Sequence, residues 1–160
     1  MTDYSTSMRT DRCGDLRIDD VGRQVTLCGW VDRRREHGEH LAFVDLRDRS
    51  GVIQVVVDGA HDLRSEYVLQ VTGDVRERPN ETANDNLATG AVEVEATEVV
   101  VLATAEPPPF PLDERTEVDE VLRLRHRYVD LRRPRMQRNL EVRARVTAAI
   151  RGAMEEQGFV

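Results

Sequence analysis

A cluster of prolines divides this chain into two parts with different periodicities. Four of the six prolines in the 160 residues lie in the stretch 106–111, which reads EPPPFP. Proline lacks a backbone N–H and fixes φ, so this run favours an extended conformation that neither a sheet nor a helix can continue. Apolar residues alternate before the run and recur every three or four residues after it. The pattern predicts a tail at 1–14, one domain at 15–105, a hinge at 106–112 and a helical segment at 113–160.

The first domain contains valine-rich segments that are separated by turn residues. We expect strands at 24–35, 41–48, 52–57, 67–78 and 92–102, with short helices at 18–21 and 60–66. Five strands with a helical excursion between the third and the fourth predict a mainly β protein, built as a closed five-stranded Greek-key barrel, the OB-fold. An immunoglobulin-like sandwich is the alternative, but it needs about seven strands.

The segment after the prolines has helix signals. Thr116 can cap a first helix, with Asp119 three residues later. Pro134 suits the first position of a long helix, and Gly158 suits the residue that follows its end. An apolar stripe along this helix has no later segment to pack on, which suggests that the chain is a piece of a larger protein.

Charge and composition exclude several classes of protein. Residues 1–112 carry 12 arginines against 21 acidic residues, so any RNA contact there must come from placed arginines rather than from net charge. The sequence has no apolar run of membrane-spanning length and no secretory signal, so we expect no membrane association. Cys13 and Cys28 read as ordinary thiols of a cytoplasmic protein. His37 and His40 have H-x-x-H spacing, but a solvated loop is favoured over a metal site.

Alternation along each strand separates an apolar face from a polar one. The second strand turns Val44 and Leu46 inward and Phe43 outward. A bulge near the end of the first strand can redirect the arginines at 33–35. The outward set predicts a platform for single-stranded nucleic acid, since a ring stacks on bases, arginine holds phosphates, and Gln or Glu reads base edges. Its members are Phe43, Gln54, Arg76, Arg78 and Glu93.

One alternative stays open for Phe43. Phe43 could belong to the core if the strand register differs from the one assumed here. No phosphate loop and no Ser/His/Asp or Cys/His signature is present, so we expect neither a catalytic residue nor a metal ligand in this chain.

Several stretches, taken together and in order, resemble bacterial aspartyl-tRNA synthetases. The resemblance covers their N-terminal domain and the start of their catalytic domain, and runs from about residue 8 to the end. Single motifs are shared with asparaginyl and lysyl relatives, whose OB domains are built alike. The stretches are 28–35 (CGWVDRRR), 43–51 (FVDLRDRSG), 71–79 (VTGDVRERP), 86–94 (NLATGAVEV), 108–111 (PPFP) and 122–134 (LRLRHRYVDLRRP).

The resemblance implies a class II enzyme that activates aspartate with ATP and Mg²⁺ and then transfers it to its tRNA. Such an aspartate–tRNA ligase is a homodimer when full length, and its OB domain grips the anticodon bases guanosine, uridine and cytidine. Phe43 matches the stacking ring, Gln54 a base-reading amide, and Glu93 the acid that recognises the first base. The arginines expected around the anticodon loop are Arg33, Arg35, Arg76 and Arg78.

The sequence departs from this family in ways that affect function. The chain ends two residues into class II motif 1, so the later motifs that bind ATP and aspartate are missing and the fragment is expected to be inactive. His37 resembles the loop of enzymes that also charge asparagine tRNA, whereas Glu81 fits neither type. The competing hypothesis is a stand-alone OB-fold module that binds single-stranded nucleic acid without catalysis.

Overall fold

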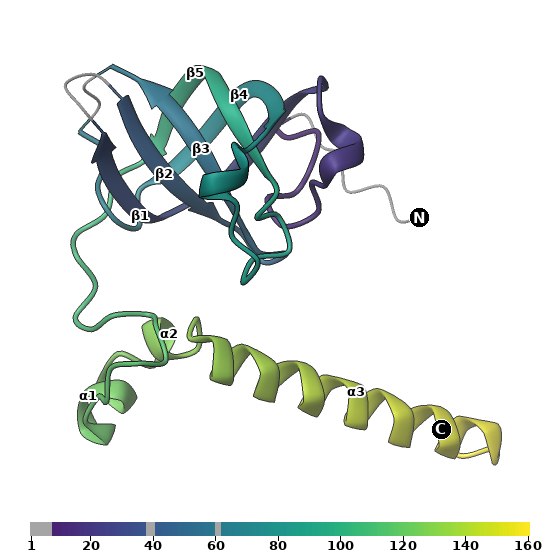
Figure 1. Ribbon diagram of the computed structural model, residues 1–160. Coiled ribbons are helices and arrows are strands. Elements are labelled where there is room, and N and C mark those ends of the chain that lie inside the picture. The colour runs from purple at the N-terminus through teal and green to yellow at the C-terminus, as the bar shows by residue number, and fades with distance from the viewer. Residues whose placement is uncertain (1–7, 38–40, 60–61) are drawn as a thin grey trace. The chain divides into compact units, whose positions relative to one another are not determined.

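The computed structural model describes residues 8–37, 41–59 and 62–160. The chain divides into two compact units, Met1–Pro107 and Pro108–Val160. The division lies inside the proline-rich stretch (Figure 1). Strands form the first unit and helices the second, as the change of periodicity predicts.

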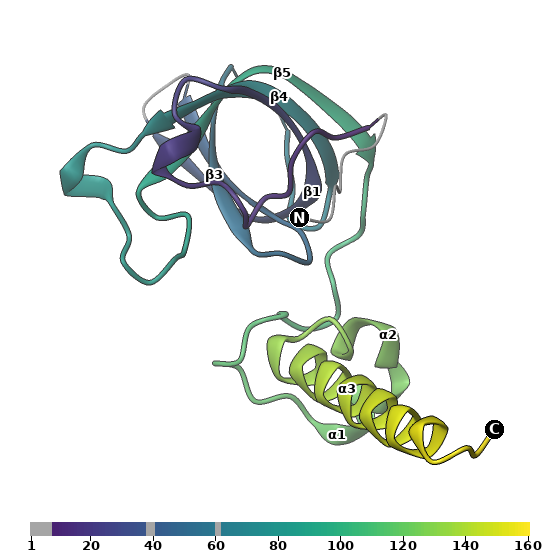
Figure 2. The same cartoon turned by 90° about the vertical axis from the view of Figure 1, so that its right-hand side faces the viewer.

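The strands of the first unit close into a barrel with the order β1-β2-β3-β5-β4 (Figure 2). Neighbouring strands are antiparallel except β3 and β5, which run parallel. The predicted OB-fold is therefore confirmed, and ring closure excludes the sandwich. The strands are β1 (Gln24–His37), β2 (Leu41–Arg47), β3 (Val52–Asp58), β4 (Val68–Glu77) and β5 (Val92–Ala103).

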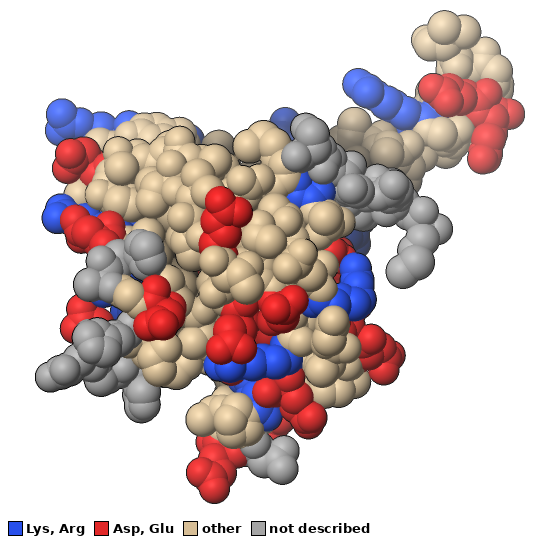
Figure 3. Space-filling model, turned by 90° about the horizontal axis from the view of Figure 1, so that it is seen from above, with Lys and Arg blue, Asp and Glu red and all other residues tan. Residues whose placement is uncertain are grey.

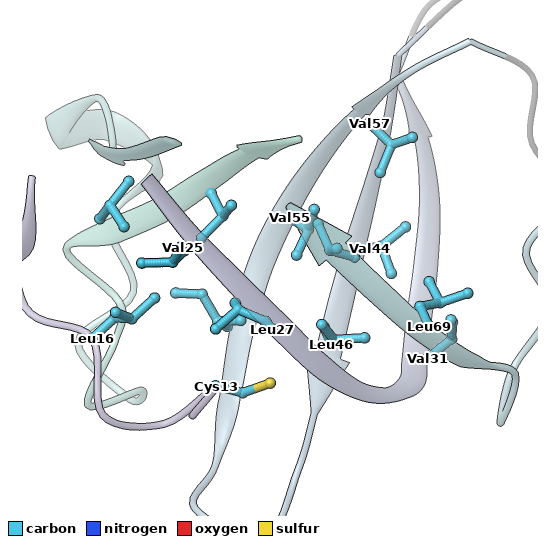
Figure 4. Close-up of a cluster of buried hydrophobic side chains, with 14 of the residues drawn as sticks. Cys13, Leu16, Val25, Leu27, Val31, Val44, Leu46, Val55, Val57 and Leu69 are labelled. Atoms are coloured by element: carbon cyan, nitrogen blue, oxygen red, sulfur yellow. The ribbon is translucent and has the colours of Figure 1, made fainter. Parts of the chain in front are cut away.

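The barrel interior is filled by the inward members of each alternating strand (Figure 4). Val44 and Leu46 are fully buried there. Phe43 lies on the outward face of the same strand, is half-buried and is not part of the core cluster. The alternative that placed Phe43 in the core is therefore wrong. The buried core residues of the five strands are Val25, Leu27, Val31, Val44, Leu46, Ile53, Val55, Val57, Leu69, Val71, Val75, Val92 and Val94.

A bulge in β1 places Arg33 on the outer wall of the barrel. The register with β2 shifts between Val31 and Arg33, as expected for this part of the first strand. Val31 faces the core opposite Leu46, and the extra residue returns Arg33 to the outer wall opposite Asp45. A bulge inserts one unpaired residue and bends the strand, so the side chains after it are aimed anew.

The segment before β1 packs on the barrel rather than forming a loose tail over its described part. Cys13 and Leu16 are buried in the core cluster (Figure 4). The N–H of Cys13 donates to Asp48 Oδ2 at 3.0 Å, and the N–H of Gly14 donates to Ser50 Oγ at 2.7 Å. A β-carbon at Gly14 would collide with the backbone carbonyl of Ser50, so glycine is required for this approach.

Two short helical segments show where local pattern and structure differ. A 3₁₀ turn, η1 (Ile18–Asp20), forms within the expected helix at 18–21. The helix expected at 60–66 is not present over residues 62–66, where a turn puts Glu66 at φ 67°, and positions 60 and 61 lie outside the described residues. A second 3₁₀ turn, η2 (Asn80–Thr82), lies in the connection between β4 and β5.

The second unit contains α1 (Glu120–Arg125), α2 (Arg127–Asp130) and α3 (Pro134–Glu156). Pro134 opens α3 at its first position, as expected. Gly158 adopts φ +82° just after the helix, and the N–H of Phe159 reaches the carbonyl of Met154, which closes a Schellman-type end. The small core of the second unit combines Phe110, Leu112 and Val129 with the partly buried Val118 and Leu122.

The expected cap of the first helix is wrong. Asp119, not Thr116, caps α1, because its carboxylate accepts from the N–H groups of Val121 and Leu122. The helix begins at Glu120, so Thr116 lies too far before it to reach those donors.

Asp130 is a fully buried carboxylate in the helical unit. Its carboxylate pairs with Arg123 at 2.8 Å and with Arg127 at 2.6 Å, and Arg133 lies 3.9 Å away. The hydrogen bond from Arg123 is the main reason why the pKa of Asp130 is lowered. The carboxylate therefore favours the folded state in its ionised form.

We expect the helical unit to lose stability in acid. Because the pKa of Asp130 is lower when folded, its contribution is present above the unfolded value of about 3.9 and is lost as pH falls through the folded pKa. Thermal melting followed by circular dichroism at the helix band should show a midpoint that drops below about pH 4. Asp130→Asn should melt earlier already at neutral pH and lack this acid-dependent part. An identical pH dependence in both proteins would contradict the assignment.

Candidate nucleic-acid interface

One register row crosses the outer wall of the barrel and takes one polar side chain from each strand. Strand pairing sets each member opposite the next, and the parallel pair β3–β5 supplies the central step. These residues are far apart in the chain, so only the closed sheet brings them together. In the order of the strands around the barrel the row reads Arg33, Asp45, Gln54, Glu93 and Arg76.

A cavity of about 620 Å³ lies over this row. All seven residues that the sequence predicted for nucleic-acid binding line it. Further walls come from Asp45 and from the connection between β4 and β5. The lining residues are Arg33, Arg35, Phe43, Asp45, Gln54, Arg76, Arg78, Pro79, Glu81, Thr82, Ala83, Asn84, Leu87 and Glu93.

Gln54 is held at both ends of its amide. Its Nε2 donates to Glu93 Oε2 at 2.7 Å, and its Oε1 accepts from Arg35 Nη2 at 3.1 Å. The side chain is only 6% exposed, so these contacts set which end of the amide faces each neighbour. The same Arg35 nitrogen donates to Asp45 Oδ1 at 2.7 Å. The amide is thus oriented before any ligand arrives.

Glu93 is a buried carboxylate surrounded by donors. It is 3% exposed, and besides Gln54 it accepts from Arg76 Nε at 2.8 Å. Arg78 Nε lies 4.0 Å from its second oxygen. A charge buried this far needs such partners, because an unpaired buried carboxylate is strongly disfavoured. Arg76 also pairs with the exposed Glu95 at 2.9 Å, so its guanidinium bridges two carboxylates.

Arg78 faces outward as expected but is 5% exposed. Its Nε donates to the carbonyl of Val92 at 3.1 Å, and its Nη1 donates to that of Thr82 at 3.5 Å. Burial lowers the pKa of this guanidinium. The connection at 79–87 covers Arg78, which single-strand alternation cannot foresee. Arg78 therefore ties this connection to the start of β5.

The ring of Phe43 and two arginines stand on the more open part of the cavity. Phe43 is half-buried opposite Arg35, and both Arg33 and Arg35 are exposed. Asp45 joins them, although the sequence analysis left it out of the binding set. Burial raises the pKa of Asp45, and the Arg35 guanidinium opposes that shift. Its outward position beside Phe43 was the available signal, and in the 79–87 connection the only residue that the sequence analysis singled out was Glu81.

The described residues provide no group of three or more His, Cys, Asp or Glu side chains able to hold a metal ion. His40 of the H-x-x-H pair lies outside the described residues. Within residues 8–37, 41–59 and 62–160, no helix is long and apolar enough to cross a membrane.

Two family models match the chain in the order of its two units. A family described as an OB-fold nucleic acid binding domain matches residues 25–102. A family described as tRNA synthetases class II (D, K and N) matches residues 119–160. The first match covers the barrel and its candidate interface, and the second covers the helices.

Curated relatives align over nearly the whole chain. It is 51% identical to the aspartate–tRNA(Asp/Asn) ligase of Heliobacterium modesticaldum over 100% of its own length. It is 52% identical to the protein of the same name from Parasynechococcus marenigrum over 96% of its length. The chain spans only 28% and 27% of those relatives.

Solved structures show the same fold. An aspartyl-tRNA synthetase from Entamoeba histolytica superposes with a TM-score of 0.85 at 19% identity, covering 100% of this chain and 40% of that one. An asparaginyl-tRNA synthetase from Pyrococcus horikoshii superposes with a TM-score of 0.74 at 24% identity, covering 92% of this chain and 34% of that one. At these identities the likeness concerns the fold alone.

Proposed function

We propose a role in tRNA recognition for this chain, which joins the OB-fold domain and the first class II segment of an aspartyl-tRNA synthetase. The whole protein is then an aspartate–tRNA ligase, and this part of it grips the anticodon of an aspartate-accepting tRNA. The observation that carries the proposal is the polar row beneath the 620 Å³ cavity, with an aromatic ring at its open side.

The chemistry of the cavity suits an unpaired base. The ring of Phe43 offers a stacking surface, which every base can use. Behind it, Gln54 and Glu93 present an oriented amide and a carboxylate to base edges. The exposed Arg33 and Arg35 can meet phosphates at the rim. The ring of Phe43 can stack on any base, but Gln54 and Glu93 can distinguish one base from another by its hydrogen-bonding groups. The combination favours recognition of particular bases over general single-strand binding.

The remaining activities belong to the whole protein in this proposal. Aspartate, ATP and Mg²⁺ would bind in the parts of the whole protein outside this chain, which spans 28% of the length of the relative from Heliobacterium modesticaldum. Acting alone, the chain would bind RNA without catalysis. The full protein would work as a cytoplasmic homodimer, as the resemblance implies.

The test is equilibrium binding of the 160-residue chain to an anticodon stem-loop carrying guanosine, uridine and cytidine. Changing the first base to cytidine should weaken binding by about tenfold to a hundredfold, since an unmatched polar pair costs roughly 1–3 kcal/mol. Equal binding to every loop would instead support the stand-alone, sequence-tolerant module. No binding to any loop would overturn both readings.

We further propose that recognition of the third anticodon base is relaxed. The two curated relatives are named as ligases for the aspartate and asparagine tRNAs. In the family that the sequence resembles, the anticodons of these two tRNAs differ in the third base. We expect the aspartate and asparagine stem-loops to bind within about tenfold of each other. Of the two residues that the sequence analysis linked to this choice, Glu81 lines the cavity, and the side chain of His37 is not among those that the structure describes. Titration of both loops under one salt condition decides this, and a preference of about a hundredfold for the aspartate loop would reject it.

A further inference from the structure

A second cavity, of about 350 Å³, lies beside the first half of β1. Trp30 contributes its indole to the lining, and the residue is 38% exposed. Three arginines surround it, two from the segment before β1 and one from the β2–β3 turn. The lining residues are Arg9, Arg12, Cys28, Gly29, Trp30, Asp48, Arg49 and Val68.

Positive charge predominates in this second cavity. Asp48 is the acidic residue among its lining residues, and its two oxygens accept from backbone N–H groups of the segment before β1 and of the β2–β3 turn. Oδ2 accepts from the N–H of Cys13 at 3.0 Å, and Oδ1 accepts from the N–H of Ser50 at 2.7 Å. The barrel half of the chain is acidic overall, and Figure 3 shows acidic groups, with arginines beside some of them, on one largely uncharged face. A cationic cavity is therefore a local exception.

The arginines before β1 are held in place by the backbone that carries them. The N–H of Thr10 donates to the carbonyl of Thr26 at 2.9 Å, and Thr10 Oγ1 accepts from the N–H of Thr26 at 2.9 Å. The N–H of Gly14 donates to Ser50 Oγ, as described above. Arg9 and Arg12 lie on either side of the Thr10 contact, so binding there would order little additional backbone.

The two cavities share one strand. Trp30 precedes Arg33 by three residues on β1, which corresponds to about 10 Å of strand. Both side chains point away from the core that contains Val31. The ion pair between Asp32 and Arg47 lies between them. A nucleic-acid strand that leaves the first cavity along β1 would reach the second within a few nucleotides.

We propose that Trp30 with Arg9, Arg12 and Arg49 forms a second RNA subsite, which binds the sugar–phosphate backbone flanking the anticodon loop. The guanidinium groups neutralise phosphates, and the indole covers a sugar or an unstacked base. The subsite rests on the proposed function, because its RNA is the continuation of the strand held in the first cavity.

The experiment compares an anticodon hairpin with its isolated seven-nucleotide loop, using the full 160-residue chain over a series of salt concentrations. Arg12→Gln and Arg49→Gln should each weaken hairpin binding about threefold to tenfold and reduce the salt slope by about 0.9 per phosphate contact. Trp30→Leu should weaken hairpin binding without changing the slope. The loop alone should bind all three variants as it binds the original chain.

Arg64→Gln is the matched control, because Arg64 is exposed, pairs with Asp62 and lines neither cavity. Arg49 lies on an exposed turn, so Arg49→Gln keeps the test valid even if Arg12→Gln lowers the thermal midpoint. Hairpin affinity and slope unchanged in Arg49→Gln and Trp30→Leu, or lowered equally in Arg64→Gln, would overturn the subsite alone. Failure of the original chain to bind even the loop would overturn the proposed function itself.

Discussion

Replacing Phe43 by alanine is expected to weaken anticodon stem-loop binding about 5- to 150-fold while leaving the thermal midpoint nearly unchanged. The ring is half-buried on the outer wall, lines the cavity and takes no part in the core cluster. Stacking on a base is worth about 1–3 kcal/mol, and that is what the substitution removes. Fluorescence anisotropy and a thermal melt on the same preparation measure the two quantities.

Leu46→Ala provides the matched control on the same strand. Leu46 is fully buried on the opposite face of β2, so its truncation should cost about 2–5 kcal/mol of stability. The fraction that remains folded should bind RNA normally. If Phe43→Ala behaves like Leu46→Ala, with a large fall in midpoint, the ring serves the fold. If its affinity is unchanged, the ring does not stack on RNA.

Replacing Glu93 by glutamine is expected to reduce discrimination for guanosine at the first anticodon position by about tenfold to a hundredfold. A carboxylate accepts from both donors on the pairing edge of guanine, whereas an amide presents a donor of its own. The structure holds this carboxylate between Gln54 and Arg76, at 2.7 and 2.8 Å. The ratio of affinities for hairpins with guanosine and with cytidine at that position is the quantity to measure.

Glu95→Gln is the control for this substitution. Glu95 lies two residues along β5, is exposed and pairs with the same Arg76, so it undergoes the same loss of charge beside the same guanidinium. Discrimination should persist in Glu95→Gln and collapse in Glu93→Gln. A ratio that stays at the original value in both variants would make Glu93 a structural charge of the barrel wall.

Local pattern determined much of the fold because strand periodicity is a local property. Alternation at Val44 and Leu46 predicted the buried face of β2, and therefore also that Phe43 points outward. The proline run predicted where the barrel ends, because proline cannot continue a sheet. Pro134 predicted the start of α3 for the same kind of reason, since its missing N–H costs nothing at the first position of a helix.

Contacts between distant segments decided the rest. Alternation tells which face a residue occupies, but the register between strands sets which residue stands opposite it. Gln54 meets Glu93 only because β3 and β5 pair in parallel across a closed barrel. Arg78 is buried between the start of β5 and the connection after β4, where it donates to the carbonyls of Val92 and Thr82. The sequence by itself determined which side chains face outward, and the tertiary structure alone arranged them into one row, because strand pairing is a property of segments far apart in the chain.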